Sequence, residues 1–384
     1  MRLVGTLAFG IRTPLVKQGD DLEKIVVDSV LAAMKSKGLE FRDRDIVGIT
    51  ESSVARTQGN FVALDVVSQD IHEKFGDEVG VVFPIFSRNR FSLILKAIAR
   101  GVKKAYVLLP YPNDEVGNPV VDPKKIWEQQ IDTFAGVYTE DEFRAMFAPE
   151  DFIHPFTGVD ITKYYRDLSK NIEVIFANNP TAILKYTKNV LAADIHTRFR
   201  TKEILRQAGA EKVYSLDEIM NQSIDGSGYN NKYGLLGSNY STDEVLKLFP
   251  INGQTLVDGV AKKLRKATGK QIEVLVYGDG AFKDPVAGIW ELADPVVSPA
   301  YTKGLLGTPH ELKLKFLIDN SGMSDEEIIA KIGEKNANQR ESLGTTPRQI
   351  TDLVGSLCDL ISGSGDKGTP IVYVQGYFDK YSDE

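Results

Sequence analysis

The chain has 384 residues, of which 42% are hydrophobic and 26% charged, and its formal net charge is -7. The length predicts two lobes or one domain with a large insertion. The acidic balance argues against a general nucleic-acid binder, and no apolar run approaches the roughly 20 residues that span a bilayer. The N-terminal residues lack a signal-peptide cleavage site, and the single cysteine, Cys358, fits a reducing compartment. We therefore expect a cytoplasmic protein.

The first half of the chain predicts alternating helices and strands. Residues 19–38 have an acidic start, apolar residues at helical spacing and a Lys-Gly end, which indicate a capped helix. An apolar strand begins at Asp45 and leads into a polar turn that ends in glycine. Residues 80–112 then read as strand, helix and strand, which is a βαβ unit. After a loop-rich stretch, the same alternation resumes over residues 171–216.

The second half begins with glycine-rich turns from Asp225 onward. A helix is predicted over residues 252–269, followed by a buried-type strand over residues 272–277. Residues 346–363 predict a helix with a proline in its first turn, and a glycine-rich loop then leads into a last strand. We expect an α+β fold, with a mixed-sheet core formed by residues 1–80 and 221–384 and an inserted α/β layer at residues 81–220.

The strand that stops at Gly278-Asp279-Gly280 places a carboxylate at its carboxyl edge, where the sites of α/β proteins collect. Asp279 would then be a metal ligand, with Lys283 following within reach. The alternative is an ordinary Asp-Gly turn. Because no two of the four histidines are at metal-binding spacing, a metal site would use oxygen ligands. Oxygen ligands favour Mg²⁺ or Mn²⁺ over zinc.

The glycine-rich segment after Asp225 contains further oxygen donors. Asp225, Ser238 and Asn239 would serve a metal-bound phosphate, and the glycines would let the backbone approach it. A plain Ω-loop has the same composition, so both interpretations stay open.

Two segments are candidates for anion binding. The loop SGSGDKGTP, residues 362–370, has glycines that free backbone N–H groups and a lysine, Lys367, that adds a point charge. Its alternative is a helix C-cap at Gly363 followed by a turn. Arg88 and Arg90 in FSRNRF would bind a carboxylate or phosphate, although two exposed arginines also suit a solvated turn.

Five stretches in this order resemble a family of ligases that add γ-linked glutamate to the precursor of the deazaflavin coenzyme F420. They are GIRTPLVKQGDDL, DIVGITESSVARTQG, GLLGSN, TGKQIEVLVYGDGAF and SGSGDKGTPIVYVQG. The resemblance covers roughly residues 1–80 and 221–384. It implies a GTP-dependent enzyme that uses Mg²⁺ or Mn²⁺ and assembles as a homodimer.

The resemblance also implies roles for individual residues. The guanine-nucleotide site would comprise Gly10, Ile11, Thr13, Pro14, Glu51, Ser52, Arg56, Ser364, Gly365, Asp366, Lys367 and Gly368. Metal ligands would be Asp279, Asp225, Ser238 and Asn239, and the catalytic residues Asp279 and Lys283. The chain departs from the family at Leu236, which replaces a metal aspartate, and at Ser364, which replaces a glutamate; Arg56 stands in place of a lysine.

The expected activity is the addition of γ-linked L-glutamate to a carboxylate acceptor, coenzyme F420-0 or a similar acid, through an acyl phosphate. Arg88 and Arg90 would bind carboxylates of the acceptor or of glutamate. One alternative is the same reaction on another acceptor, such as a folate. A second is a nucleotide-binding protein without ligase activity. A third, a sugar- or dinucleotide-binding enzyme, lacks support because no G-x-G-x-x-G follows a strand of the inserted layer.

Overall fold

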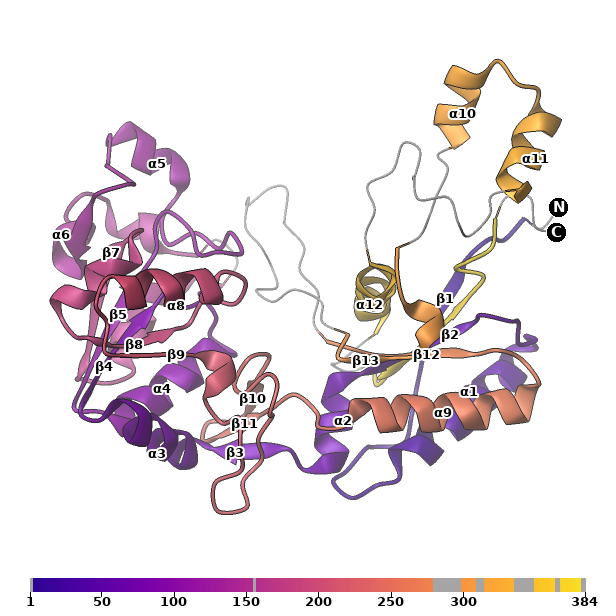
Figure 1. Cartoon of the computed structure of the whole chain (residues 1–384), viewed down its shortest axis with the longest axis horizontal. Coiled ribbons are helices and arrows are strands. Elements are labelled where there is room, and N and C mark those ends of the chain that lie inside the picture. The colour runs from indigo at the N-terminus through magenta and orange to yellow at the C-terminus, as the bar shows by residue number, and fades with distance from the viewer. Residues whose placement is uncertain are drawn as a thin grey trace. The chain divides into compact units, whose positions relative to one another are not determined.

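The computed structural model describes residues 3–154, 157–278, 298–308, 314–334, 349–362 and 367–380. The chain divides into two compact units (Figure 1). Unit 1 comprises Met1–Thr57, Asn252–Gly280 and Pro295–Glu384, and unit 2 comprises Gln58–Ile251 and Ala281–Asp294. The unit boundaries therefore differ from the limits 81 and 220 that the sequence suggested for an insertion. The division into a ligase-like core and an insertion stays a prediction.

Unit 1 contains a five-stranded sheet built from both ends of the chain. Its order is β1 (Leu7–Ile11), β14 (Ile371–Gln375), β2 (Ile46–Thr50), β12 (Glu273–Tyr277) and β13 (Ala300–Tyr301). Strands β2 and β12 are parallel, whereas the other neighbours are antiparallel. The sheet is therefore mixed, which confirms the expected α+β class.

Helices cover both faces of this sheet (Figure 1). The apolar sides of α1 (Leu22–Lys37) and α9 (Gly253–Thr268) bury Val26, Val30 and Val260 against one face. Helix α12 (Ile350–Ile361) covers the other face, where Gly48 of β2 leaves room for Cys358. A small helical hairpin, α10 (Leu314–Ser321) and α11 (Asp325–Glu334), has its own apolar contacts.

Cap signals predicted α1 correctly. The side chain of Asp21 accepts a hydrogen bond from the N–H of Lys24, and Gly38 ends the helix in the left-handed region. One other prediction was wrong in detail. The polar segment after β2 forms a helix, α2 (Glu51–Gln58), because its small residues pack inward. The helix expected over residues 346–363 is described as α12, Ile350–Ile361, and Pro347 lies outside the described residues.

Unit 2 contains a six-stranded sheet that matches the alternation read from the sequence. Its order is β6 (Val137–Thr139), β7 (Ile172–Ala177), β5 (Lys104–Leu109), β4 (Glu78–Val82), β8 (Asn189–Ala192) and β9 (Lys212–Ser215). All neighbours are parallel except β6 and β7. After β4, the chain adds β5 and then β7 on one side of β4, and it later adds β8 and β9 on the other side. The direction therefore reverses between β4 and β8, the position where ligands bind in such sheets.

The remaining elements of unit 2 surround this sheet. The helices are α3 (Leu64–Phe75), α4 (Phe91–Gly101), α5 (Pro123–Glu128), α6 (Glu140–Arg144), α7 (Ile161–Asp167) and α8 (Arg198–Gln207). A second sheet pairs β10 (Asn239–Thr242) with β11 (Val245–Lys247) and β11 with β3 (Phe61–Ala63). Short 3₁₀ turns are η1 (Pro149–Phe152), η2 (Pro180–Lys185), η3 (Leu216–Glu218) and, in unit 1, η4 (Lys303–Leu305). Helices α3 and α4 pack closely, since the Ser68 hydroxyl donates to the Ala97 carbonyl at 2.8 Å.

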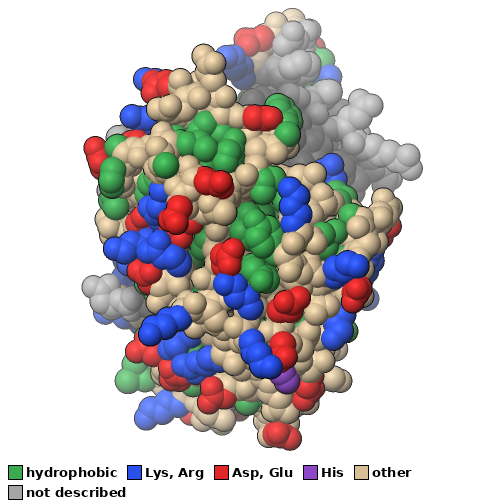
Figure 2. Space-filling model, turned by 90° about the vertical axis from the view of Figure 1, so that its left-hand side faces the viewer, with side chains coloured by type: hydrophobic (Ala, Val, Ile, Leu, Met, Phe, Trp, Pro, Cys, Tyr) green, Lys and Arg blue, Asp and Glu red, His purple; other side chains and the backbone are tan. Residues whose placement is uncertain are grey.

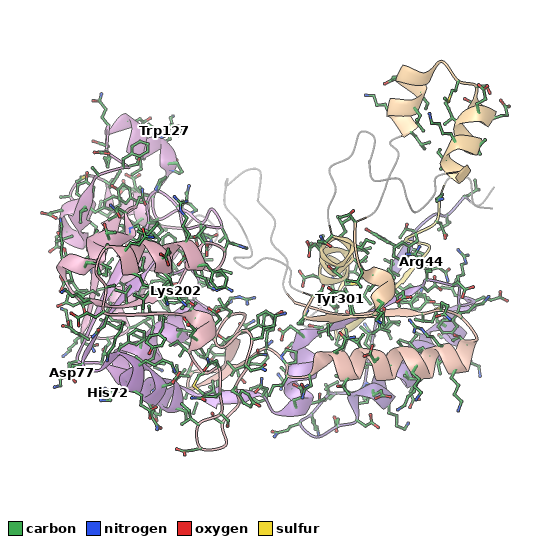
Figure 3. The ribbon with its side chains drawn as sticks, in the orientation of Figure 1. Arg44, His72, Asp77, Trp127, Lys202 and Tyr301 are labelled. Carbon is green, nitrogen blue, oxygen red and sulfur yellow. The ribbon has the colours of Figure 1, made fainter. Side chains whose placement is uncertain are left out.

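The surface carries charges of both signs. Figure 2 shows Lys and Arg side chains interspersed with Asp and Glu around exposed hydrophobic side chains. Trp127 of α5, labelled in Figure 3, is 73% exposed. Within the described part of the chain, no helix is both long enough and apolar enough to traverse a bilayer.

Candidate functional site

Three of the segments expected to contact nucleotide meet at one edge of the unit 1 sheet. Ile371, at the start of β14, lies opposite Ile11 at the end of β1 and opposite Ile49 near the end of β2. The N–H of Thr50 donates to the carbonyl of Pro370 at 3.0 Å. The end of β1, the end of β2 and the C-terminal loop therefore share this edge.

The contact between β1 and the C-terminal loop is tight at Gly10. A Cβ atom at position 10 would lie 2.9 Å from the Cβ of Thr369, which is closer than side chains can approach without movement. Thr369 follows Lys367 and Gly368, both exposed, and Gly368 has φ 62°. The described end of the loop is thus held against β1 while Lys367 faces solvent.

Strand β12 ends at the same edge. Tyr277, its last residue, lies opposite Thr50 in a parallel pairing. Asp279 follows two positions later and lies outside the described residues, as do Lys283, Ser364, Gly365 and Asp366. The roles suggested for these five residues stay predictions.

The other expected nucleotide contacts occupy the segments that follow β1 and β2. Glu51 and Ser52 form the start of α2, and Glu51 is buried. Arg56 lies later in the same helix, is exposed and forms no ion pair with the described residues. In the loop after β1, the hydroxyl of Thr13 donates to the carbonyl of Pro14 at 2.9 Å. The structure therefore places these residues in the segments that follow the ends of β1 and β2.

Unit 2 brings together two sets of residues that are far apart in sequence. Residues 83–90, here called the arginine loop, include Arg88 and Arg90. This loop follows β4 at its carboxyl end and leads into α4. The N–H of Tyr240 donates to the carbonyl of Asn89 at 3.0 Å, so the arginine loop adjoins the segment of Ser238 and Asn239. No sequence pattern predicted this contact.

The expected metal-binding residues of unit 2 have contrasting environments. Ser238 is 2% exposed, and its hydroxyl has no hydrogen-bond partner in the described part of the chain. The side-chain oxygen of Asn239 accepts the N–H of Tyr240 at 2.8 Å. Asp225 is exposed at a turn with φ 49°. No hydrogen bond between described residues joins Asp225 to Ser238 or Asn239.

These side-chain oxygens are of the type that Mg²⁺ and Mn²⁺ prefer. The Ser238 hydroxyl, which has no hydrogen-bond partner among the described residues, fits the role of a metal ligand. Within the ranges that the structure describes, no group of three His, Cys, Asp or Glu side chains is arranged to hold a metal ion. The metal site that the resemblance implies includes Asp279 and stays a prediction.

Two buried asparagines shape the glycine-rich segment, and sequence reasoning missed both. Asn60 donates to the carbonyl of Tyr229 and accepts its N–H, each at 3.0 Å. Asn230 donates to the carbonyls of Phe249 and Pro250 at 3.2 Å. Because each asparagine acts on backbone distant in sequence, no local signal marks them.

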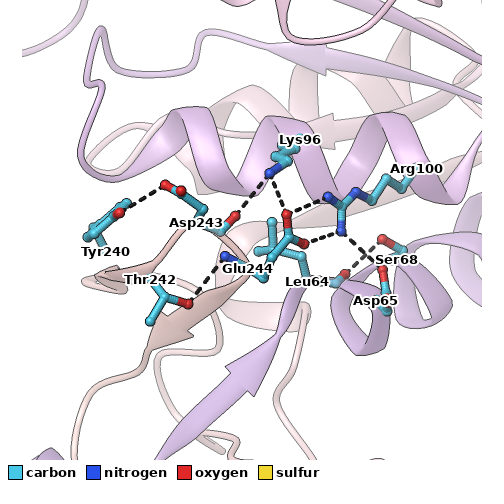
Figure 4. A network of polar contacts seen from close by, with 9 residues as sticks. All are labelled: Leu64, Asp65, Ser68, Lys96, Arg100, Tyr240, Thr242, Asp243 and Glu244. Carbon is cyan, nitrogen blue, oxygen red and sulfur yellow. Dashed lines mark hydrogen bonds and ion pairs between the residues drawn. The ribbon is translucent and has the colours of Figure 1, made fainter.

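A network of ion pairs ties the β10–β11 hairpin to α4 (Figure 4). The carboxylate of Glu244 accepts two hydrogen bonds from Arg100, at 2.6 and 2.9 Å, and one from Lys96 at 2.7 Å. Arg100 also pairs with Asp65 of α3 at 3.1 Å. The hydrogen bonds from Arg100 and Lys96 lower the pKa of Glu244 to about 2. The hairpin that begins at Asn239 is therefore attached to the helix that follows the arginine loop.

Comparison with known proteins identifies the family. The chain matches the F420-0:Gamma-glutamyl ligase family over residues 10–376, a range that includes the region expected to be inserted. It is also similar to the coenzyme F420:L-glutamate ligase of Methanocaldococcus jannaschii, with 27% identity over 150 residues. That similarity covers 38% of the chain and 49% of the relative, so the chain spans about half the length of this curated protein. The family match extends over nearly the whole chain, which therefore belongs to the F420-0:gamma-glutamyl ligase family.

Proposed function

We propose that the chain is a GTP-dependent ligase that adds γ-linked L-glutamate to a carboxylate acceptor, coenzyme F420-0 or a similar acid. Family membership supports the reaction class. The main structural support is the contact of Gly10 with Thr369 and of Thr50 with Pro370, which joins three expected nucleotide-binding segments at one sheet edge.

In the proposed reaction, the γ-phosphoryl group of GTP is transferred to an oxygen of the acceptor carboxylate, which gives GDP and an acyl phosphate. The amine of glutamate then attacks the activated carbonyl carbon. Phosphate leaves with the electrons of the broken C–O bond, and the amine loses a proton to give the amide. Such phosphoryl transfer depends mainly on positioning and on stabilisation of charge.

Residues of unit 1 would hold the nucleotide. Backbone at Gly10 and in the loop up to Gly368 would approach the phosphates, and Lys367 and Arg56 would offset their negative charge. Both side chains are exposed, so they can reach a ligand without unfolding local structure. Asp279 and Lys283 are the proposed catalytic residues.

Four residues are proposed as metal ligands: Asp279, Asp225, Ser238 and Asn239. A bound Mg²⁺ or Mn²⁺ would offset charge on the phosphates during transfer. In unit 2, Arg88 and Arg90 would bind carboxylates of the acceptor or of glutamate. A homodimer is the proposed assembly, and sedimentation of the purified chain would test it.

Thermal unfolding with GTP, GDP, ATP and ADP, each with and without Mg²⁺ or Mn²⁺, tests the nucleotide site because a ligand of the folded state raises its stability. We expect a metal-dependent shift with guanine nucleotides that is lost in Asp279→Asn. Release of GDP and phosphate that depends on both glutamate and acceptor would then establish the ligase. GDP release with a folate but not with F420-0 would identify the folate as the acceptor. No nucleotide shift would contradict the proposal.

A further inference from the structure

The arginine loop of unit 2 is held in place by a buried carboxylate. Asp114, in the loop after β5, accepts the N–H of Phe86 at 2.9 Å. The same carboxylate accepts the N–H groups of Val116 and Asn118 at 3.1 and 2.8 Å, and the side-chain amide of Asn118 at 2.9 Å. Asp114 is only 6% exposed, so these charge-assisted hydrogen bonds fix the loops after β4 and β5 to each other.

A buried tyrosine holds the next part of the same loop. The hydroxyl of Tyr165 on α7 donates to the carbonyl of Ile85 at 2.6 Å and accepts the N–H of Ser87 at 2.8 Å. The Tyr165 side chain is fully buried and packs against Phe91 at the start of α4. The N–H of Tyr240 on β10 adds a further hydrogen bond, to the carbonyl of Asn89. The loop backbone is therefore held by three separate elements: the loop after β5, α7 and β10.

Within the described part of the chain, this scaffold leaves the cationic side chain of Arg88 available. Arg88 is exposed and forms no ion pair within the described residues, and its carbonyl accepts the hydroxyl of Ser92 in α4. Helix α4 has neither a side-chain N-cap nor an acidic residue in its first turn. The positive end of the helix and Arg88 therefore both favour an anionic group at the carboxyl end of β4.

We infer that Asp114 and Tyr165 are positioning residues that hold Arg88 for binding the carboxylate of an acidic substrate in unit 2. The inference rests on the proposed function for the identity of that substrate. It assigns no contact with substrate to Asp114 or Tyr165, which act through the backbone of residues 85–87. Their removal should therefore weaken binding of the acid while leaving nucleotide binding in unit 1 unchanged.

The chain supplies a matched control for each residue. Glu115, next to Asp114, is a half-buried carboxylate that likewise accepts backbone N–H groups, but from Ile195 and His196 after β8. Tyr164, next to Tyr165, is 38% exposed. Among the described residues, neither Glu115 nor Tyr164 forms a hydrogen bond with residues 85–90. Glu115→Gln and Tyr164→Phe thus change the same chemistry on the same segments while keeping the hydrogen bonds of the arginine loop.

Calorimetric titration of the full chain with L-glutamate and, separately, with F420-0 tests the inference. We expect Arg88→Ala, Asp114→Asn and Tyr165→Phe to weaken binding of the same ligand about tenfold, the loss of one charge-assisted contact. The control variants should stay within about twofold of the wild type, because neither removes a hydrogen bond to the arginine loop. In turnover assays the three variants should raise KM for that ligand, with kcat and KM for GTP nearly unchanged.

The outcomes separate the two proposals. A wild-type protein that binds the acid but forms no amide would contradict the proposed ligase activity. The affinities of the variants for the acid would still test the positioning roles of Asp114 and Tyr165. The inference is overturned if the wild type binds neither acid. It is also overturned if Asp114→Asn and Tyr165→Phe bind like the wild type, or if the control variants weaken binding equally. Thermal unfolding of each variant checks that the fold is kept.

Discussion

Gly10 and Thr369 are packed so closely that a Cβ atom at residue 10 would lie 3.0 Å from the Thr369 hydroxyl oxygen as well as 2.9 Å from its Cβ. The two residues come from opposite ends of the chain, on β1 and just before β14. Their contact fixes the distance between the N-terminal strand and the C-terminal loop at the expected nucleotide site.

Replacement of Gly10 by alanine should therefore move the C-terminal loop. Overpacking of this kind costs about 1–3 kcal/mol, so we expect a lower free energy of unfolding together with weaker GTP binding. Chemical denaturation and nucleotide titration measure the two effects. Gly5→Ala is the control, since a Cβ atom at residue 5 meets nothing within 4 Å. An unchanged free energy of unfolding in Gly10→Ala would contradict this prediction, because it would show that Thr369 can move away from residue 10 without cost.

Arg56→Ala should weaken GTP binding without affecting the fold. Arg56 is exposed and unpaired among the described residues, so its proposed contact with phosphate is the main interaction lost. We expect KM for GTP to rise roughly tenfold, the value of one hydrogen bond to a charged group. Arg56→Lys, which keeps the charge, should retain most of the affinity. Equal KM values for the alanine and wild-type proteins would remove Arg56 from the nucleotide site.

Glu244→Gln should loosen the β10–β11 hairpin from α4. Because the pKa of Glu244 is lowered to about 2 from 4.5, its stabilising contribution is present above pH 4.5 and is lost as the pH falls through about 2. Thermal unfolding at neutral pH and low salt should therefore show a lower Tm for Glu244→Gln, and the difference from wild type should vanish near the lower pKa.

The matched control for Glu244 is Asp77→Asn, which removes a single exposed pair with Lys103 at 2.8 Å. Isolated surface pairs contribute little, so this variant should unfold almost like the wild type. If both variants lower Tm equally, the network around Glu244 has no special role in anchoring the hairpin.

Asp114 should make the stability of the protein depend on pH. Burial raises the pKa of Asp114 from 3.8 to about 6, although its N–H donors lower it in part. The neutral form therefore favours folding: its contribution is fully present below pH 3.8 and is lost as the pH rises through about 6. The shift corresponds to about 3 kcal/mol.

Asp114→Asn, which is neutral at every pH, tests this effect. Its free energy of unfolding should decrease less than that of the wild type between about pH 4 and pH 6.5, because one titrating group is gone. Denaturant titrations at several pH values measure the difference. A wild type that instead gained stability over this range relative to the variant would show that the four N–H donors outweigh burial and keep the pKa low.

Local patterns in the sequence were enough to predict several features of the structure. The caps at Asp21 and Gly38 marked both ends of α1, and the strand–helix alternation between residues 78 and 215 marked the layer in unit 2. The five motifs identified the family. Each of these signals depends on residues close together in the chain, where hydrogen-bond geometry and hydrophobic period fix the conformation.

Tertiary structure decided the rest. Whether residues 51–58 form a turn or a helix depended on the burial of Val54 and Ala55, which packing controls. The contacts of Asn89 with Tyr240 and of Phe86 with Asp114 join segments that only the order of the strands brings together. Such contacts form when distant apolar faces bury one another, and buried polar groups must then find partners in the neighbouring segment. For that reason the composition and spacing of either segment alone could not reveal them.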